Sequence, residues 1–245
     1  MLQSTKAIIL RTTAYGDTSL IVSAFTERYG LQQYMVKGAR KSGKKGGSLA
    51  SMLQPAAILE LVVYHHEQKQ LQLVKEIKWD TVYSQVMSGI SKNAIALFMV
   101  ELLTKCLKQP EQNDELFEFV ESNLQLLDQC DSVVAANIPL FFALKLAGIL
   151  GFRMEDEYSD DQQFLDLQAG NFCKEPPFHG MYLDPLLSQV THQLLQHSNA
   201  ITLYRIKLHQ SQRRELLQAY IHFYQFHIAD FGHMKSVQVL QEVLS

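Results

Sequence analysis

The segment AYGDTSLIVSAFTERYGLQQYMVKGARK, residues 14–41, decides the fold of the first third of the chain. It contains SLIVSAFT, residues 19–26, a run rich in β-branched and apolar residues between turn sequences at 14–17 and 29–30. LQQYMVK, residues 31–37, then alternates roughly between polar and apolar side chains, as a half-buried strand does. The segment therefore predicts consecutive strands that are joined by short turns.

The sequence on either side of this segment extends the β pattern. KAIILRTT (6–13), ILELVVY (58–64) and LQLVKEI (71–77) also have strand composition, and residues 48–53 suit a short helix that stops before Pro55. Five short strands and one helical insertion within about 80 residues are typical of an OB-type barrel. The sequence thus predicts an N-terminal OB-fold β-barrel over residues 1–80.

From residue 81 onward the apolar residues recur with helical spacing. Helices are expected at 92–107, 114–127, 135–150, 183–196, 211–231 and 235–244. The longest apolar run, residues 138–152, is interrupted by Lys145 and is too short for a membrane span. We therefore expect residues 135–150, which are almost wholly apolar, to form the buried central helix. The prediction is a two-domain α+β protein, with an all-helical C-terminal domain over residues 81–245.

Charge is distributed unevenly between the two predicted domains. Residues 1–80 carry eight Lys and three Arg against six acidic residues, a net charge of +5. Residues 81–245 carry 11 basic and 19 acidic residues, a net charge of −8, so the whole chain has a net charge of −3. This asymmetry indicates an anionic partner for the N-terminal domain.

The segment VKGARKSGKKGGS, residues 36–48, concentrates that positive charge in a glycine-rich loop. One interpretation is a solvated insertion; the other is a nucleic-acid contact, because OB folds bind single strands in a positively charged groove. We favour the second, since lysine and arginine release counterions from phosphates without reading sequence. Arg11, with Lys6, Lys75 and Lys78, extends the surface, and Tyr15 is a candidate for base stacking, whereas Tyr34 suits the core. The candidate DNA-binding residues are Lys37, Arg40, Lys41, Lys44, Lys45, Arg11 and Tyr15.

The sequence contains no recognisable catalytic or metal motif. Cys106, Cys130 and Cys173 lie far apart, and no Ser/His/Asp order, phosphate loop or acidic metal cluster stands out. We therefore expect no catalytic residue, no cofactor and no bound metal. The alternatives to DNA binding are an RNA-binding OB module of translation or RNA metabolism and, third, a nuclease, against which the missing carboxylate cluster weighs.

Several of these residues recur in a known family. Asp17 before Thr18-Ser19, the strand ending Phe25-Thr26, and Lys37-Gly38-Ala39-Arg40 resemble the N-terminal domain of RecO proteins, a family of bacterial recombination mediators. FALKLAGILGF (142–152) and HMKSVQVLQEVL (233–244) are similar to the central and last helices of that family. The resemblance covers most of the chain, with little support between about 80 and 135.

The resemblance implies a non-enzymatic function in DNA repair. It implies binding of single- and double-stranded DNA, strand annealing and, with RecR, the loading of RecA onto DNA covered by single-stranded-DNA-binding protein. It also implies a cytoplasmic, nucleoid-associated protein that contacts the acidic tail of that single-strand-binding protein. Such a tail needs an apolar groove rimmed by cations. The candidate contacts are Lys145, Arg205, Lys207, Arg213 and Arg214.

The sequence departs from the family in one region. Many members carry a four-cysteine zinc site in the loop that corresponds to residues 153–182, but this chain has only Cys173 and His179 there. A structural zinc site takes four nitrogen or sulfur ligands. We therefore expect a degenerate, metal-free zinc-ribbon-like loop with Phe164, Leu165, Leu167 and Phe172 as a small apolar core.

Overall fold

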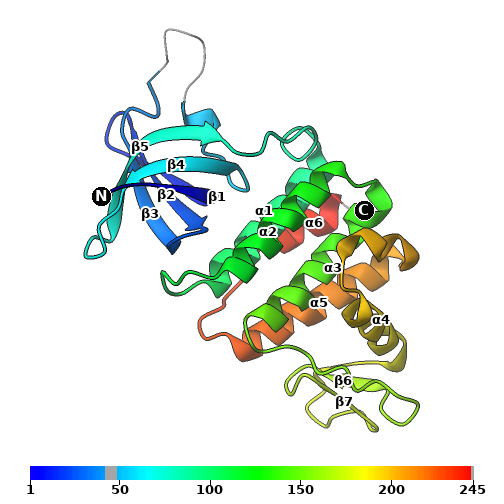
Figure 1. Ribbon diagram of the computed structural model, residues 1–245. Coiled ribbons are helices and arrows are strands. Elements are labelled where there is room, and N and C mark those ends of the chain that lie inside the picture. The colour runs from blue at the N-terminus through cyan, green and yellow to red at the C-terminus, as the bar shows by residue number, and fades with distance from the viewer. Residues whose placement is uncertain (42–48, 244–245) are drawn as a thin grey trace. The chain divides into compact units, whose positions relative to one another are not determined.

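The computed structural model describes residues 1–41 and 49–243 (Figure 1). It divides into two compact units. The first comprises Met1–Ser84 together with Leu103–Gln125, and the second comprises Gln85–Leu102 together with the chain from Leu126 onward. The barrel and the helical region are described separately below.

Within residues 1–41 and 49–84, five strands form a closed barrel in the order β1-β2-β3-β5-β4, with β4 paired to β1. Neighbours are antiparallel except β3 and β5, which are parallel. This confirms the predicted OB-type barrel followed by a helical region. The elements are β1 (Leu2–Tyr15), β2 (Ser19–Thr26), β3 (Gly30–Val36), the 3-10 helix η1 (Leu49–Ser51), β4 (Ile58–Tyr64) and β5 (Leu71–Trp79).

Strand β1 is longer than the sequence pattern indicated, because it has two partners. Its residues Leu2–Ile8 pair with β4, and Ala7–Tyr15 pair with β2. The register with β2 shifts between Ile9 and Arg11, which marks a β-bulge. A bulge bends a strand and increases its twist, which is what a strand shared by two sides of a barrel requires.

Two helices, α1 (Ile90–Cys106) and α2 (Asp114–Gln129), follow the barrel in the sequence. The start of α2 packs on the barrel within the first unit. The rings of Phe25 on β2 and Phe117 on α2 lie 5.7 Å apart between centroids, and both residues are buried. Gly30 has a φ of +59°, and a Cβ there would lie 2.0 Å from the carbonyl oxygen of Glu111. Only glycine fits this position, because the backbone of the α1–α2 connection passes directly over it.

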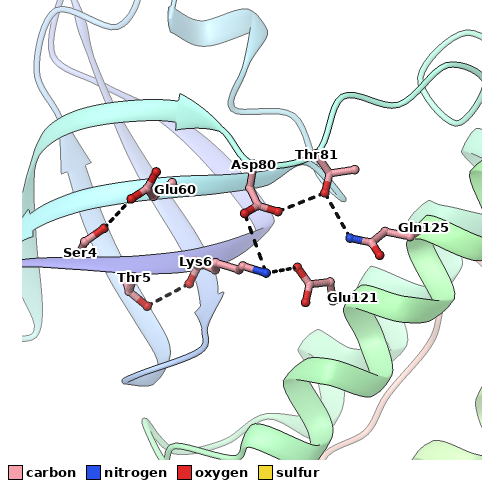
Figure 2. A network of polar contacts seen from close by, with 8 residues as sticks. All are labelled: Ser4, Thr5, Lys6, Glu60, Asp80, Thr81, Glu121 and Gln125. Carbon is pink, nitrogen blue, oxygen red and sulfur yellow. Dashed lines mark hydrogen bonds and ion pairs between the residues drawn. The ribbon is translucent and has the colours of Figure 1, made fainter.

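Polar contacts surround this apolar junction. The Lys6 ammonium reaches Glu121, and the Thr81 hydroxyl joins Asp80 to Gln125 (Figure 2). These contacts join the end of the barrel, at Asp80 and Thr81, to α2, at Glu121 and Gln125, within the first unit. The boundary near residue 80 that the sequence pattern predicts remains a prediction.

The second unit is built around α3. Its helix has Asp131 as N-cap, with the side chain accepting a hydrogen bond from the Val134 N–H, and α3 packs against η2, α4 and α5. Helix α3 is long and apolar enough to cross a membrane, but 67% of it is buried inside the structure. It is the helix that the sequence analysis predicts as the buried central helix. This unit contains the first part of α1, the last residues of α2, α3 (Ser132–Ile149), α4 (Pro185–Gln196), the 3-10 helix η2 (Ala200–Arg205), α5 (Gln210–His227) and α6 (Lys235–Val243).

The region after residue 80 is largely, rather than entirely, helical. In the described part of residues 153–184, β6 (Phe164–Asp166), β7 (Asn171–Cys173) and β8 (Tyr182–Leu183) form a small sheet in the order β7-β6-β8. Leu165, Leu167 and Phe172 are buried, whereas Phe164 is half-buried. Three of the four residues that the sequence analysis places in a small apolar core are therefore buried. The strands themselves were not predicted, because runs of two or three residues are too short to show an alternating pattern.

Candidate nucleic-acid interface

The segment that follows β3 is anchored to the barrel at both of its described ends. Gly38 adopts a φ of +69°, which lets the chain turn directly after the strand, and the Lys41 N–H donates to the Gly38 carbonyl over 3.0 Å. Ala39 is fully buried, and its carbonyl accepts from the Ala50 N–H over 3.0 Å. The basic segment therefore leaves and re-enters the barrel at fixed points.

Arg40 joins this segment to the β1–β2 turn. Its backbone N–H donates to the Thr18 carbonyl over 3.0 Å, and its Nη2 donates to the carbonyl oxygens of Gly16, over 3.0 Å, and Asp17. Hydrogen bonds from a charged donor are stronger than neutral ones. Arg40 thereby holds the cationic strand end next to the turn that follows Tyr15.

The predicted DNA-binding residues that the structure describes lie on the surface of this barrel. Lys37, Arg40 and Lys41 are exposed after β3, Tyr15 is 51% exposed at the end of β1, and Arg11 is exposed at the β1 bulge. Lys44 and Lys45 lie outside the described residues. Arg40 brings the Lys37–Lys41 segment to the Tyr15 turn, whereas Arg11 stands four residues back along β1.

Lys6 and Tyr34, which were also considered from the sequence, are not available to DNA in this structure. The Lys6 ammonium lies 2.9 Å from Glu121 and 3.9 Å from Asp80, so its charge is neutralised by acids rather than presented to DNA. Tyr34 is fully buried in the barrel, as its alternating strand pattern predicted, and burial raises the pKa of its hydroxyl. A base cannot stack on a ring that no solvent reaches.

The candidate partner contacts in the second unit do not form a single cluster. The Lys145 ammonium donates to the Leu195 carbonyl at the end of α4 over 2.9 Å, and burial lowers its pKa. Arg205 lies over its neighbour Tyr204, with Nε 3.2 Å from the hydroxyl. Lys145, on α3, and Arg205, on η2, are therefore both engaged locally.

Arg213 and Arg214, at the start of α5, border an apolar depression. It is lined by Pro139, Leu140, Leu217 and Leu240, and the two guanidiniums donate to the Leu208 and Gln241 carbonyls over 2.7 and 2.6 Å. A second depression adjoins it, because Ala136 and Arg213 line both, and it adds Lys207 and Asn137. Three of the five candidate contacts, Lys207, Arg213 and Arg214, therefore border the two depressions, from α5 and the loop before it.

This double depression contains polar atoms without protein partners. Asn137 is buried; its Nδ2 donates to the Leu203 and Ile206 carbonyls, but its Oδ1 has no partner. The Nε of Arg213 and the Nε2 of Gln210 are likewise buried and unpaired, and burial lowers the pKa of Arg213. Buried polar groups are normally hydrogen-bonded, so these three atoms, which lie below the accessible surface of the depressions, are exceptions in the described structure.

The loop at residues 153–182, where the sequence analysis expects no metal, is organised by local contacts. Asp166 accepts from the Gln168 and Ala169 N–H groups, and its Oδ2 lies 3.1 Å from the His179 Nε2. The Cys173 thiol donates to the Phe164 and Glu175 carbonyls. In the part of the chain that the structure describes, no three His, Cys, Asp or Glu side chains cluster as metal ligands would.

Comparison with known proteins matches both parts of this architecture. Residues 1–83 match the family described as Recombination protein O N terminal, and residues 87–236 match Recombination protein O C terminal. The chain belongs to the RecO family. It is 34% identical over 250 residues to the DNA repair protein RecO of Christiangramia forsetii, with 99% of each chain covered. It is 32% identical to that of Flavobacterium psychrophilum, with 98% of each covered, and 29% identical to that of Porphyromonas gingivalis, again with 98% of each covered.

RecO proteins are DNA repair and recombination proteins that act without enzymatic chemistry. Membership in the RecO family therefore confirms the expectation drawn from Asp17, Phe25-Thr26 and the Lys37–Arg40 segment. The two matched RecO segments correspond to the barrel and to the largely helical region.

Proposed function

We propose that this RecO-family chain binds single- and double-stranded DNA through the basic end of its barrel and promotes the annealing of complementary strands. The observation that carries the proposal is the Arg40 contact with the Gly16 and Asp17 carbonyls. It fixes the cationic Lys37–Lys41 segment beside the turn that carries exposed Tyr15, on a domain of net charge +5.

The chemistry of such a surface suits annealing. Two single strands are polyanions that repel each other, and cations lower this repulsion by displacing condensed counterions. Contacts to phosphates position the strands but read no sequence, so any complementary pair is served. Tyr15 adds a face on which an unpaired base stacks.

The basic loop is tested by changing Lys41, Lys44 and Lys45 together to Ala. Each phosphate contact that is lost should flatten the slope of log K against log salt by about 0.7 for single strands and about 0.9 for duplex. The measurement is fluorescence anisotropy of a labelled oligonucleotide across several salt concentrations. The matched control changes Lys108, Lys174 and Lys235, three exposed lysines outside the barrel, to Ala.

The outcomes of this experiment are distinct. Wild-type affinity and slope in the loop variant would show that the loop is only solvated. An equal loss in the control would show that net charge, rather than the loop, sets the affinity. Preference for RNA over DNA of the same sequence in a competition titration would contradict the repair function and favour an RNA-binding module.

The mediator activity extends this DNA binding. With RecR, the protein helps RecA replace single-stranded-DNA-binding protein on DNA, in the cytoplasm and in association with the nucleoid. A strand-annealing assay with and without single-stranded-DNA-binding protein tests this function directly. Annealing only of naked strands, with no activity on covered ones, would contradict the mediator role.

The double depression between α3 and α5 is the proposed dock for the acidic tail of single-stranded-DNA-binding protein. It combines the apolar Leu140 and Leu217 with the cations Arg213, Arg214 and Lys207. An acidic tail with an apolar end needs both. Arg214→Glu should weaken the binding of a tail peptide, whereas Lys145→Met should not, because Lys145 lines neither depression. Equal losses in the two variants would place the dock elsewhere.

A further inference from the structure

A polar groove of about 1130 Å³ lies at the end of the barrel opposite the Lys37–Lys41 segment. It is bordered by the β2–β3 turn, the β4–β5 turn and the α1–α2 connection. Strand β3 begins at this groove and ends at Lys37, and its 7 residues span roughly 23 Å at about 3.3 Å per residue. The lining of the groove includes Arg28, Tyr29, Gln32, His65, Lys69 and Gln112.

Buried polar side chains hold both turns of this polar groove in place. The fully buried Thr26 hydroxyl accepts from the Tyr29 N–H over 3.1 Å and donates to the Gly30 carbonyl over 2.9 Å. The buried Gln72 amide accepts from the His66 N–H and donates to the His66 and Lys69 carbonyls, over 2.6 to 2.9 Å. A site whose walls are fixed in advance loses less conformational entropy when a ligand binds.

The two turns meet in an aromatic stack. The rings of Tyr29 and His65 lie 3.8 Å apart between centroids and are inclined by 13°. Both residues line the groove, and burial lowers the pKa of His65, which keeps the imidazole neutral at pH 7. A rigid, uncharged pair of rings is a stacking surface for any nucleobase, because every base has a π-face.

The chemistry around this stack matches the remaining parts of a nucleotide. Arg28 and Lys69 are exposed cations of the two turns, and Glu67 is the one acidic residue among the described residues that line the groove. The side-chain amides of Gln32 and Gln112 both donate and accept hydrogen bonds, as base edges require. Positive charge, amides and a stacking surface together distinguish this groove from a purely electrostatic patch.

We propose that the polar groove is a second nucleic-acid site, which holds an unpaired base on the Tyr29–His65 stack and its phosphates on Arg28 and Lys69. The proposal deepens the proposed function, on which it rests. The basic loop holds either form of DNA by its phosphates, whereas the polar groove accepts only unpaired bases. Two sites at opposite ends of one barrel allow a single strand to be held open while its complement approaches the loop.

The test compares Tyr29→Leu with Tyr64→Leu in the full-length protein. Tyr64 is 44% exposed on the same barrel but does not line the groove. Tyr29→Leu should weaken binding of a labelled oligothymidine by at least about fivefold, with no change in salt slope, because a stacking contact but no charge is lost. Duplex affinity should stay at the wild-type value, and Tyr64→Leu should behave as wild type in both titrations.

A second variant tests the groove without disturbing a partly buried ring, in case Tyr29→Leu lowers the melting temperature. Arg28→Gln with Lys69→Gln changes only exposed side chains and should flatten the single-strand salt slope by about 1.4, or about 0.7 for each contact. Photo-crosslinking of a bromodeoxyuridine oligonucleotide should map to Tyr29 or His65, and should persist when Lys41, Lys44 and Lys45 are changed to Ala.

The outcomes separate the groove from the basic loop. Wild-type single-strand affinity in both groove variants, with no crosslink at Tyr29 or His65, overturns the groove site and leaves the loop function standing, even if the variants lose a protein partner. A wild-type protein that binds no DNA overturns the groove site and the proposed function together.

Discussion

The ammonium of Lys6, on β1, lies 2.9 Å from the carboxylate of Glu121, on α2, so a strand of the barrel is paired with a helix that follows it by more than a hundred residues (Figure 2). The hydrogen bond to Glu121 raises the pKa of Lys6, with Asp80, at 3.9 Å, adding to it, although partial burial opposes the shift. The pair is exposed to screening, since 37% of the Lys6 side chain is accessible.

A double-mutant cycle with Lys6→Met and Glu121→Gln should therefore give a coupling energy of about 0.2–1 kcal/mol for unfolding. Because the folded pKa of Lys6 is raised, this contribution is complete below the ordinary lysine pKa and is lost as pH rises through the folded value. Urea unfolding at pH 7 and in high salt measures it. A coupling above about 2 kcal/mol would show that the pair is far less screened than its exposure indicates.

The apolar part of the same junction should matter more. Phe117 is 2% exposed and contacts the fully buried Phe25, so Phe117→Ala should lower the free energy of unfolding by about 3–5 kcal/mol. Phe178→Ala is the control, because the Phe178 side chain is fully exposed and its loss leaves no cavity. Equal unfolding midpoints for the two variants would contradict the packing of α2 on the barrel.

The predicted boundary near residue 80 is tested with fragments. A fragment of residues 1–80 should give a β-type circular dichroism spectrum, because the hydrogen bonds of the barrel lie within it. It should melt at a lower temperature than a fragment of residues 1–125, which keeps Phe117 over Phe25. A mainly helical spectrum from residues 1–80 would contradict a separately folding barrel.

Asp166 should make stability depend on pH. Burial of the carboxylate opposes ionisation, but the N–H groups of Ala169 and Gln168 and the ring of His179 more than offset it and lower its pKa. Asp166→Asn should cost about 1.5–3 kcal/mol at pH 7, the usual value for a hydrogen bond to a charged group. Because the carboxyl pKa is lowered by folding, the ionised Asp166 stabilises the folded protein fully at pH values above the unfolded pKa near 3.9. This stabilisation is lost as pH falls through the folded pKa.

Thermal unfolding of the wild type, Asp166→Asn and Asp160→Asn between about pH 3 and pH 7 checks this dependence. The wild-type advantage over Asp166→Asn should shrink toward the acid end, while exposed Asp160→Asn should follow the wild type throughout. A difference that stays constant with pH would show that the ionised form of Asp166 is not favoured by folding.

The absence of a zinc site also stays a prediction. The purified protein should contain no stoichiometric zinc, and a chelator should leave its melting temperature unchanged, because Cys173 bonds to carbonyls and His179 to Asp166. Elemental analysis and a melting curve with and without chelator measure both. One zinc ion per chain would show that these side chains exchange their hydrogen bonds for a metal.

The sequence by itself determined the types of the longer elements, but not the three short strands β6, β7 and β8. The alternation in residues 31–37 and the run 58–64 identify strands, and the helical spacing after residue 81 identifies helices, because local periodicity reflects which face of each element is buried. The concentration of cations after β3 was also visible, since charge is a property of residue type. RecO membership could be inferred from the Lys37–Arg40 segment and the short motifs before it.

Only the tertiary structure decided which distant residues meet. Nothing in the sequence pairs Tyr29 with His65, Lys6 with Glu121, or Pro139 with Arg214, because each pair joins elements that are far apart along the chain. Nor could it show that Arg40 bonds to the β1–β2 turn while Lys6 is neutralised. Periodicity fixes the face that a side chain occupies on its own element, but the partner on the other side depends on closure of the barrel and on helix packing.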